Sequence, residues 1–122
     1  MTHSLEKRPD GFLYSRFVGT IDEAAIEEFK ANVAVYLPEA TPDSPLHFIA
    51  DASDEGSWEF GARQAFTKYF DDQRLGHVAV ISASRFTRVV STFMVKATGR
   101  GDTVRFFETE QEAVAWLQQS TQ

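Results

Sequence analysis

The sequence predicts an α/β domain built on a single, mostly parallel sheet with an antiparallel strand at its N-terminal edge. Short apolar segments with strand character alternate with segments whose apolar residues recur at helical spacing, in the order ββαβαβαβα. Such alternation favours parallel strands joined by right-handed crossovers. Of the 122 residues, 43% are hydrophobic and 11 are Phe, so the chain can bury a sizeable core. We expect residues 1–122 to form one domain.

Composition excludes several classes of protein. The chain contains no Cys, which excludes a disulfide framework, a thiolate nucleophile and any metal site that depends on Cys. The first eight residues hold no apolar run, and no window approaches the roughly 20 apolar residues that span a bilayer, so we expect a cytoplasmic protein without stable membrane insertion. The formal net charge is −6 and no Lys/Arg cluster offsets it, so we expect no nucleic-acid partner.

The first third of the chain predicts a hairpin and a helix. Pro9–Gly11 is a turn and the aromatic-rich segment Phe12–Val18 has strand character, which together suggest an N-terminal β-hairpin. Thr20 and Glu23 form a capping box that starts a helix, and Pro38 ends it. The apolar stripe of this helix consists of Ile26, Phe29, Val33, Tyr36 and Leu37.

The middle of the chain predicts two buried strands on either side of a second helix. The apolar segments Leu46–Ala50 and His77–Ile81 have the character of strands that are covered on both faces. Between them, Ser57 can cap a helix. The apolar stripe of this helix consists of Ala62, Ala65, Phe66 and Tyr69.

The last part of the chain predicts a third helix, a strand and a closing helix. Ser84 can cap the third helix, Val104–Phe107 has strand character, and Thr109 and Glu112 form a second capping box. The apolar stripe of the third helix consists of Phe86, Val89, Val90, Phe93, Met94 and Ala97. The inward-facing residues of the closing helix are Ala113, Trp116 and Leu117.

Three stretches resemble a known family. Gly19–Asp22 is similar to the start of its first helix, and Asp51 ends a buried strand where the family has a strand-terminal Asp. Phe106–Leu117, with the preceding Arg105, resembles its closing motif R-x-F-x-x-x-x-x-A-x-x-W-L. The family is the SpoIIAA-like branch of the STAS domains, and the resemblance covers roughly residues 10–118.

The resemblance implies a small α/β domain that binds protein partners or small ligands and does not catalyse a reaction. In the anti-sigma-factor antagonists of the family, a partner kinase phosphorylates a Ser within an Asp-Ser-Ser-Gly turn. The matching stretch here, Asp51–Ser57, lacks that motif, and Ser53 or Ser57 could stand in as phosphoacceptor. Some relatives are suspected of binding lipids or other apolar ligands, and the aromatic content of this chain is compatible with such a ligand.

The carboxyl ends of parallel strands share one edge of a sheet, where ligands usually bind. Two predicted helices start at that edge, and their free N–H groups, aided by Arg85 and Arg88, would suit a phosphate or carboxylate. The alternative is that Ser57 and Ser84 are ordinary helix caps. The polar residues that we expect at this edge are Asp51, Ser53, Ser57, Ser82, Ser84 and Arg85, with Arg88 as a further cation.

Other clusters of polar residues in the sequence predict neither a metal site nor a cofactor site. Asp51, Asp54 and Glu55 would be either a magnesium-type site or unpaired surface acids, and their spacing is not that of an EF-hand loop. His3, His47 and His77 have no metal-ligand spacing. No motif of nucleophilic catalysis occurs, so we assign no catalytic residue.

Aromatic residues surround the second predicted helix on more than one side. Trp58 and Phe60 lie partly off its apolar stripe, so with Phe86 they would line a pocket or meet a partner or a second copy of the chain. The alternative is a satellite core beneath the loop formed by residues 52–57.

Three hypotheses about function are therefore open. The first is a non-catalytic binding or regulatory module that recognises a protein partner or a small apolar, lipid-like or anionic ligand, with phosphorylation of Ser53 or Ser57 as a variant. The second is a small hydrolase or transferase, which requires Asp51 or a His beside a nucleophilic Ser. The third is a self-associating structural protein such as a homodimer.

Overall fold

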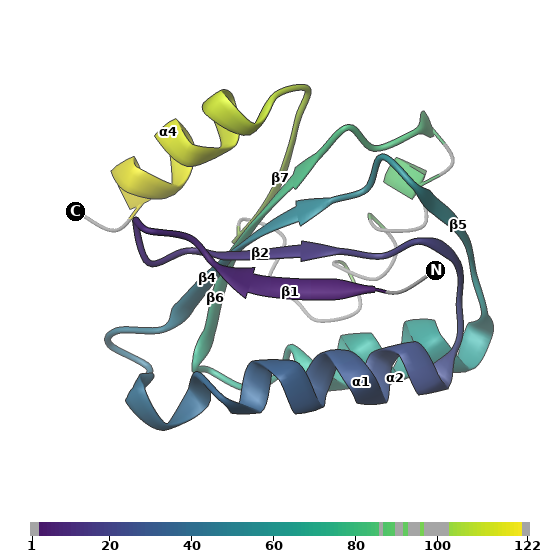
Figure 1. The fold of residues 1–122 in the computed structure, drawn as a ribbon, viewed down its shortest axis with the longest axis horizontal. Coiled ribbons are helices and arrows are strands. Elements are labelled where there is room, and N and C mark those ends of the chain that lie inside the picture. Colours follow the sequence, from purple (N-terminus) through teal and green to yellow (C-terminus); the bar gives the residue numbers. More distant parts are fainter. Residues whose placement is uncertain (1–2, 86, 90–91, 93–95, 97–102, 121–122) are drawn as a thin grey trace.

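The computed structural model describes residues 3–85, 87–89, 92, 96 and 103–120. Its main sheet has the strand order β1-β2-β4-β6-β7 (Figure 1). β1 pairs with β2 in the antiparallel direction, and the other three pairings are parallel. The predicted mostly parallel sheet with an antiparallel N-terminal edge strand is therefore confirmed. The strands are β1 (Ser4–Lys7), β2 (Leu13–Arg16), β4 (Leu46–Asp51), β6 (Leu75–Ile81) and β7 (Val104–Phe107).

A second, two-stranded sheet is present that the sequence does not predict. In it, β3 (Gly19–Ile21) pairs in parallel with β5 (Glu55–Trp58). Gly19 lies opposite Glu55, and the Gly19 N–H donates to the Asp54 carbonyl at 2.9 Å. This pairing holds both segments in an extended conformation, so neither can supply the first turn of a helix.

Two predicted helix starts are therefore wrong. Thr20 lies in β3, and α1 (Glu23–Ala34) begins after Asp22, whose Oδ1 accepts a hydrogen bond from the Ala25 N–H at 2.9 Å. Ser57 lies in β5, and α2 (Phe60–Tyr69) begins after Glu59, which makes no side-chain capping bond. In both cases the pairing of β3 with β5 moves the N-cap two residues towards the C-terminus.

Helices cover both faces of the main sheet. α1 and α2 pack against each other on one face, and α4 (Glu110–Ser120) lies on the other (Figure 1). A short 3-10 helix, η1 (Leu37–Glu39), follows α1 at Pro38. The larger core lies under α1 and α2 and includes Leu13, Ile21, Ile26, Val33, Phe48 and Leu75. The smaller core lies under α4 and includes Phe12, Ile49, Ala79, Ala113 and Leu117.

Hydrogen bonds confirm the two remaining predicted helix caps, Thr109 and Ser84. The Glu112 N–H donates to Thr109 Oγ1 and the Thr109 N–H donates to Glu112 Oε1, both at 3.2 Å, which confirms that capping box. The Thr87 N–H donates to Ser84 Oγ at 3.1 Å, which confirms Ser84 as a cap. The backbone is helical at residues 85, 87–89, 92 and 96.

The apolar stripe of this third helix is described only in part. Val89 was expected to be buried, but it is 50% exposed. It lies on the same side as Arg85, Arg88 and Thr92, which are exposed as well. The other members of the expected stripe lie outside the described residues: Phe86, Val90, Phe93, Met94 and Ala97.

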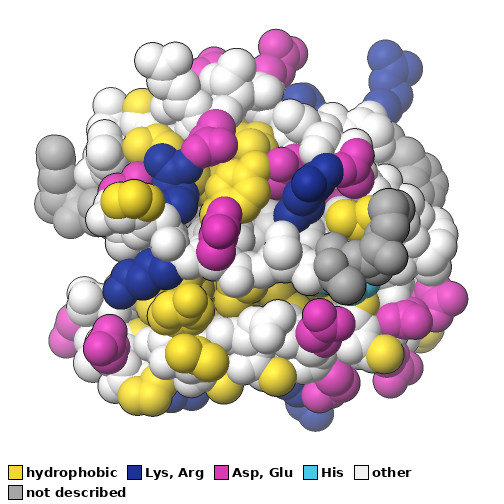
Figure 2. Space-filling view, viewed as in Figure 1, with side chains coloured by type: hydrophobic (Ala, Val, Ile, Leu, Met, Phe, Trp, Pro, Cys, Tyr) yellow, Lys and Arg dark blue, Asp and Glu magenta, His cyan; other side chains and the backbone are white. Residues whose placement is uncertain are grey.

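β1 forms the N-terminal edge of the main sheet. Leu5 is partly buried against the larger core, whereas Glu6 and Lys7 are exposed. Figure 2 shows hydrophobic side chains along the line between β1 and α1, with acidic and basic side chains around them. Charged side chains on an edge strand disfavour the addition of a further strand.

The variant Gly76→Ala is expected to destabilise the protein by about 1–3 kcal/mol. A Cβ at Gly76 would lie 2.7 Å from Cε1 and Nδ1 of His47 and 3.0 Å from the Leu46 carbonyl oxygen. The His47 ring is held in place because its Nδ1 accepts a hydrogen bond from the His77 N–H at 2.9 Å. Chemical denaturation of the variant and of the wild type measures the difference in the free energy of unfolding.

Gly61→Ala is the matched control for that variant. Gly61 lies in the first turn of α2, where the three atoms nearest to an added Cβ all belong to the side chain of Glu23, which is exposed and can turn away. Alanine is favoured over glycine in helices by up to about 1 kcal/mol, so this variant should be at least as stable as the wild type. Equal losses at both glycines would contradict the steric explanation.

Candidate functional site

The loops that follow β4 and β6 meet at the carboxyl edge of the main sheet. Asp51 lies opposite Ile81 in the parallel register, and the Ala52 N–H donates to the Ile81 carbonyl at 2.9 Å. The Ser82 N–H donates to the Phe107 carbonyl at 3.2 Å, which ties the second loop to the end of β7. The prediction that these loops share one edge is therefore confirmed.

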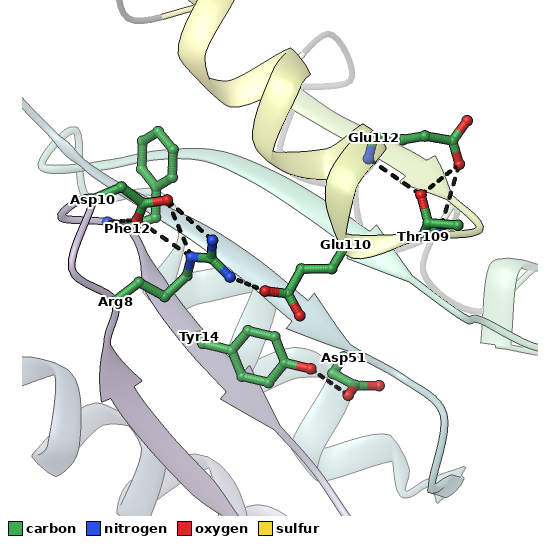
Figure 3. A network of polar contacts seen from close by, with 8 residues as sticks. All are labelled: Arg8, Asp10, Phe12, Tyr14, Asp51, Thr109, Glu110 and Glu112. Carbon is green, nitrogen blue, oxygen red and sulfur yellow. Dashed lines mark hydrogen bonds and ion pairs between the residues drawn. The ribbon is translucent and has the colours of Figure 1, made fainter.

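A short chain of hydrogen bonds organises this edge around Asp51. The Tyr14 hydroxyl donates to Asp51 Oδ2 at 2.5 Å (Figure 3). The Ser53 hydroxyl and backbone N–H donate to Asp51 Oδ1 at 2.7 and 3.0 Å. Three donors therefore converge on one carboxylate, and they hold the exposed Ser53 hydroxyl at a defined position beside the strand end.

These hydrogen bonds decide the charge states of Asp51 and Tyr14. Burial raises the pKa of Asp51, but the hydrogen bonds from Tyr14 and Ser53 outweigh burial and hold that pKa below its usual value. Burial and the hydrogen bond to Asp51 together raise the pKa of Tyr14 to about 12. At neutral pH the site therefore contains a carboxylate and a neutral phenol.

Ion pairs lie on either side of these hydrogen bonds around Asp51. Arg16 pairs with Asp54, which joins the end of β2 to the loop after β4. Arg8 pairs with Asp10 and with Glu110, which joins the N-terminal hairpin to the start of α4 (Figure 3). Tyr14, Arg16 and Asp51 all project from the face of the sheet that α4 covers, because their side chains share the parity of Phe12 and Ile49.

Glu55 lies beside this site but is mostly buried. Its Oε1 accepts a hydrogen bond from Trp58 Nε1 at 2.9 Å. Burial raises the pKa of Glu55, the hydrogen bond from Trp58 lowers it and the charge of Asp51 raises it, so that the net pKa is about 7. Glu55 therefore changes its protonation state near neutral pH.

Of the three aromatic residues expected to form a surface, Trp58 is buried and Phe60 is exposed. Trp58 is 6% exposed and packs edge-on against Phe17 and Phe66, with ring centroids 5.5 and 5.3 Å apart. Side chains alternate along β5, so Ser57 points to solvent and Trp58 points into the larger core. Phe60 is 67% exposed at the start of α2, and Phe86 lies outside the described residues. Trp58 is therefore a core residue and does not line a binding surface.

The other predicted site residues are distributed along the same edge. Ser84 caps the third helix, and Arg85 and Arg88 are exposed on its first turns. In the part of the chain that the structure describes, no hydrogen bond or ion pair connects these three residues to Asp51 or Ser53. The structure thus brings together Asp51 and Ser53, and it leaves Ser84, Arg85 and Arg88 as a separate group.

The three acidic residues of the loop do not converge on one point. Asp51 accepts from Tyr14 and Ser53, Asp54 pairs with Arg16, and Glu55 accepts from Trp58. Among the described residues, no group of three or more His, Asp or Glu side chains could hold a metal ion. Asp51 and Asp54 are instead bound to two different residues of β2, and Glu55 is bound to a residue of its own strand, β5.

Sequence reasoning missed Tyr14 and Arg16. They precede Asp51 by more than 30 positions, and only the parallel register of β2 with β4 places Arg16 opposite Asp51. Within the strand, Tyr14 looks like any other aromatic residue of a β-segment. A pairing of the first long strand with the strand that ends at Asp51 would have identified both residues.

Comparisons with known proteins agree with this architecture. No curated protein sequence matches the chain. An uncharacterised protein with a SpoIIAA-like fold from Shewanella loihica has 18% sequence identity and a TM-score of 0.71, over 95% of this chain and 92% of that one. The anti-sigma factor antagonist SpoIIAA in its unphosphorylated form has 16% identity and a TM-score of 0.67, over 96% and 98% of the two chains.

Two further matches have the same fold. An anti-sigma factor antagonist from Mycobacterium paratuberculosis has 17% identity and a TM-score of 0.64, over 96% of this chain and 93% of that one. SpoIIAA from Bacillus in its phosphorylated form has 17% identity and a TM-score of 0.55, over 95% and 99% of the two chains. None of the helices in the described part of the chain has the length and apolar character to cross a membrane. The SpoIIAA-like family model matches residues 12–118, and the chain therefore belongs to the SpoIIAA-like family.

Proposed function

We propose that the chain is a non-catalytic regulatory module that binds a protein partner at the carboxyl edge of its main sheet, with the loop around Ser53 in the contact. The observation that carries this proposal is the convergence of Tyr14 and Ser53 on Asp51, which fixes an exposed hydroxyl at the strand end. Solved structures with this fold include anti-sigma factor antagonists, which supports a regulatory role.

Ser53 is also the better of the two candidates for a phosphoacceptor. SpoIIAA exists in unphosphorylated and phosphorylated forms, which supports the presence of an acceptor in this chain. Ser53 lies in the loop between β4 and β5, whereas Ser57 lies within β5, whose backbone is paired with β3. A kinase needs an accessible segment around the acceptor, and the loop offers one more readily than a paired strand does.

Phosphorylation of Ser53 would change the binding surface by simple electrostatics. The phosphate adds a charge of about −1.5 to −2 and removes the hydroxyl proton that is donated to Asp51. The new charge would lie beside Asp51 and Asp54 and would be repelled by both. The loop would therefore lose its present conformation, which is the behaviour required of a switch.

The hydrolase alternative is supported less well by the same geometry. Ser53 Oγ does lie 2.7 Å from a carboxylate oxygen of Asp51, so the required pair exists. However, the lowered pKa of Asp51 makes it a weak proton acceptor, and general-base catalysis is most efficient with a pKa near the working pH. His47 and His3 are engaged elsewhere, with the backbone N–H groups of His77 and Val18 respectively.

Site-specific photo-crosslinking in cells tests the proposed contact. A photoreactive amino acid at position 57 should form a covalent adduct with one protein partner, because Ser57 is exposed next to the loop. The same amino acid at position 43 is the control, because Asp43 is exposed in the loop before β4, at the opposite edge of the sheet. Equal adducts from both positions, or none from position 57, would argue against this edge as the contact.

The effect of phosphorylation is tested with the same photoreactive amino acid, which serves as the reporter of partner binding. In chains that carry the reporter at position 57, Ser53→Glu should reduce the yield of the adduct at least several-fold, because it adds a charge beside Asp51. Ser53→Ala, which removes the hydroxyl without adding charge, should retain most of the yield. Mass spectrometry of the chain from cells should find one added phosphate on Ser53, and a Ser53→Glu chain that crosslinks like the wild type would exclude the switch.

A further inference from the structure

A separate group of basic residues lies on the third helical segment, outside the site around Asp51. Arg85, Arg88 and Lys96 line an open pocket of about 270 Å³ together with Val89 and Thr92. All five side chains are exposed. The chain as a whole has a net charge of −6, so a concentration of three cations in one pocket is unusual for this surface.

Among the described residues, these three cations have no acidic partner, in contrast to four basic residues elsewhere in the fold. Arg8, Arg16, Lys30 and Arg74 each pair with a carboxylate. In contrast, within the described ranges no carboxylate oxygen lies within ion-pair distance of the three pocket cations. Their charge is therefore available to an external anion.

The pocket also has features that orient its charged groups. The Arg88 guanidinium lies over the Phe106 ring, 5.7 Å from the ring centroid, which restricts the directions that it can take. The Thr92 hydroxyl donates to the Arg88 carbonyl at 2.7 Å, so its proton is already used. Val89, which is 50% exposed, provides an apolar surface between the charged groups.

We propose that this pocket binds a phosphate-bearing ligand through Arg85, Arg88 and Lys96. Arginine presents a planar fork of N–H donors that matches phosphate oxygens in pairs, and two such forks stand three residues apart on helical backbone. Lys96 follows eight residues later and would hold a second anionic group of the same ligand. Val89 would contact an apolar part of the ligand between the two charged ends.

Calorimetric titration of the full chain tests this proposal, with sodium tripolyphosphate as the soluble probe in about 0.15 M salt, where weak surface attraction is largely screened. We expect saturable binding with one ligand per chain. Arg85→Gln and Arg88→Gln should each weaken binding at least about ten-fold, because each removes charge-assisted hydrogen bonds to phosphate. Arg85 is exposed and forms no hydrogen bond or ion pair with the described part of the chain, so its loss should leave the circular dichroism spectrum unchanged.

Lys68→Gln is the matched control, because Lys68 is exposed on α2 and its loss changes the net charge by the same amount. It should change the affinity less than about two-fold. A second arm measures sedimentation with phosphatidylglycerol vesicles. Binding to vesicles alone, lost in Arg85→Gln and Arg88→Gln, would identify a lipid headgroup as the source of the phosphate. Absence of binding to both probes, or equal losses in the Lys68→Gln control, would overturn the proposal.

Discussion

Replacing Glu55 by glutamine is expected to stabilise the protein by about 3 kcal/mol at pH 8 and to have little effect at pH 4.5. In the folded wild type, burial raises the pKa of Glu55 to about 7 from an ordinary value of 4.5. Above pH 7 the folded protein must therefore hold a carboxylate in a poorly solvated place. Glutamine accepts the same hydrogen bond from Trp58 without a charge.

The direction of this effect follows from proton linkage. A carboxyl group whose folded pKa is raised contributes stability that is fully present below its unfolded pKa and is lost as the pH rises through its folded pKa. The wild type should therefore lose this contribution between about pH 4.5 and pH 7, and the Glu55→Gln variant should not. The experiment is urea denaturation of both proteins across this range, with the difference between their free energies of unfolding plotted against pH.

The titration of His47 needs to be separated from that of Glu55. Burial, with a smaller effect from His77, lowers the pKa of His47 to about 4, so His47 acts in the opposite direction and reduces stability as the pH falls below about 6.5. His47 is present in both proteins, so its contribution cancels in the difference. Glu59→Gln removes an exposed carboxylate four residues further along and serves as the charge control. A difference that does not vary with pH would show that Glu55 is not buried as described.

Replacing Phe29 by alanine is expected to lower the free energy of unfolding by about 3–5 kcal/mol. Phe29 lies on the inner face of α1 and is 5% exposed. Its ring is in contact distance of five other rings, with centroid separations from 5.6 to 6.4 Å. These rings belong to Phe17, Phe48, Phe66, Tyr69 and Phe70, so a single truncation removes contacts to β4, α2 and the segment before β3.

Val35→Ala is the control for this variant, because Val35 follows directly on α1 and is 74% exposed. It should change stability by less than about 0.5 kcal/mol. A domain of this size has a total stability of about 5–15 kcal/mol, so Phe29→Ala can leave too little folded protein to measure. Phe29→Leu, with an expected loss of about 1–2 kcal/mol, then provides the measurement. Equal losses in Val35→Ala and Phe29→Leu would contradict the central position of Phe29.

The regular elements were predictable because their signals are local. The apolar segments at 46–50, 77–81 and 104–107 became β4, β6 and β7, and the Thr109 capping box opened α4. In each case a strand is marked by a run of apolar residues, or a helix start by a hydrogen bond between residues three apart. Nothing distant in the chain is needed to form these signals.

The small second sheet was not predictable in the same way. β3 and β5 are three and four residues long, and each is held extended by the other across more than 30 positions of sequence. Thr20 and Ser57 are equally acceptable in a strand and at a helix start, so the local pattern favoured the wrong alternative for both. The error at Ser57 also misplaced Trp58, because neighbouring residues point to opposite sides of a strand but not of a helix.

By itself, the sequence determined the fold class, the mostly parallel sheet and the edge at which the loops after β4 and β6 come together. Only the tertiary structure decided which groups touch at that edge: Tyr14 on Asp51, Arg16 on Asp54 and Trp58 on Glu55. The physical reason is that patterns of hydrophobicity and capping act over a few residues, whereas the contacts of Tyr14 and Arg16 depend on the register between β2 and β4 and that of Trp58 depends on the pairing of β5 with β3. A register is selected by the packing of the whole core, and no short segment contains that information.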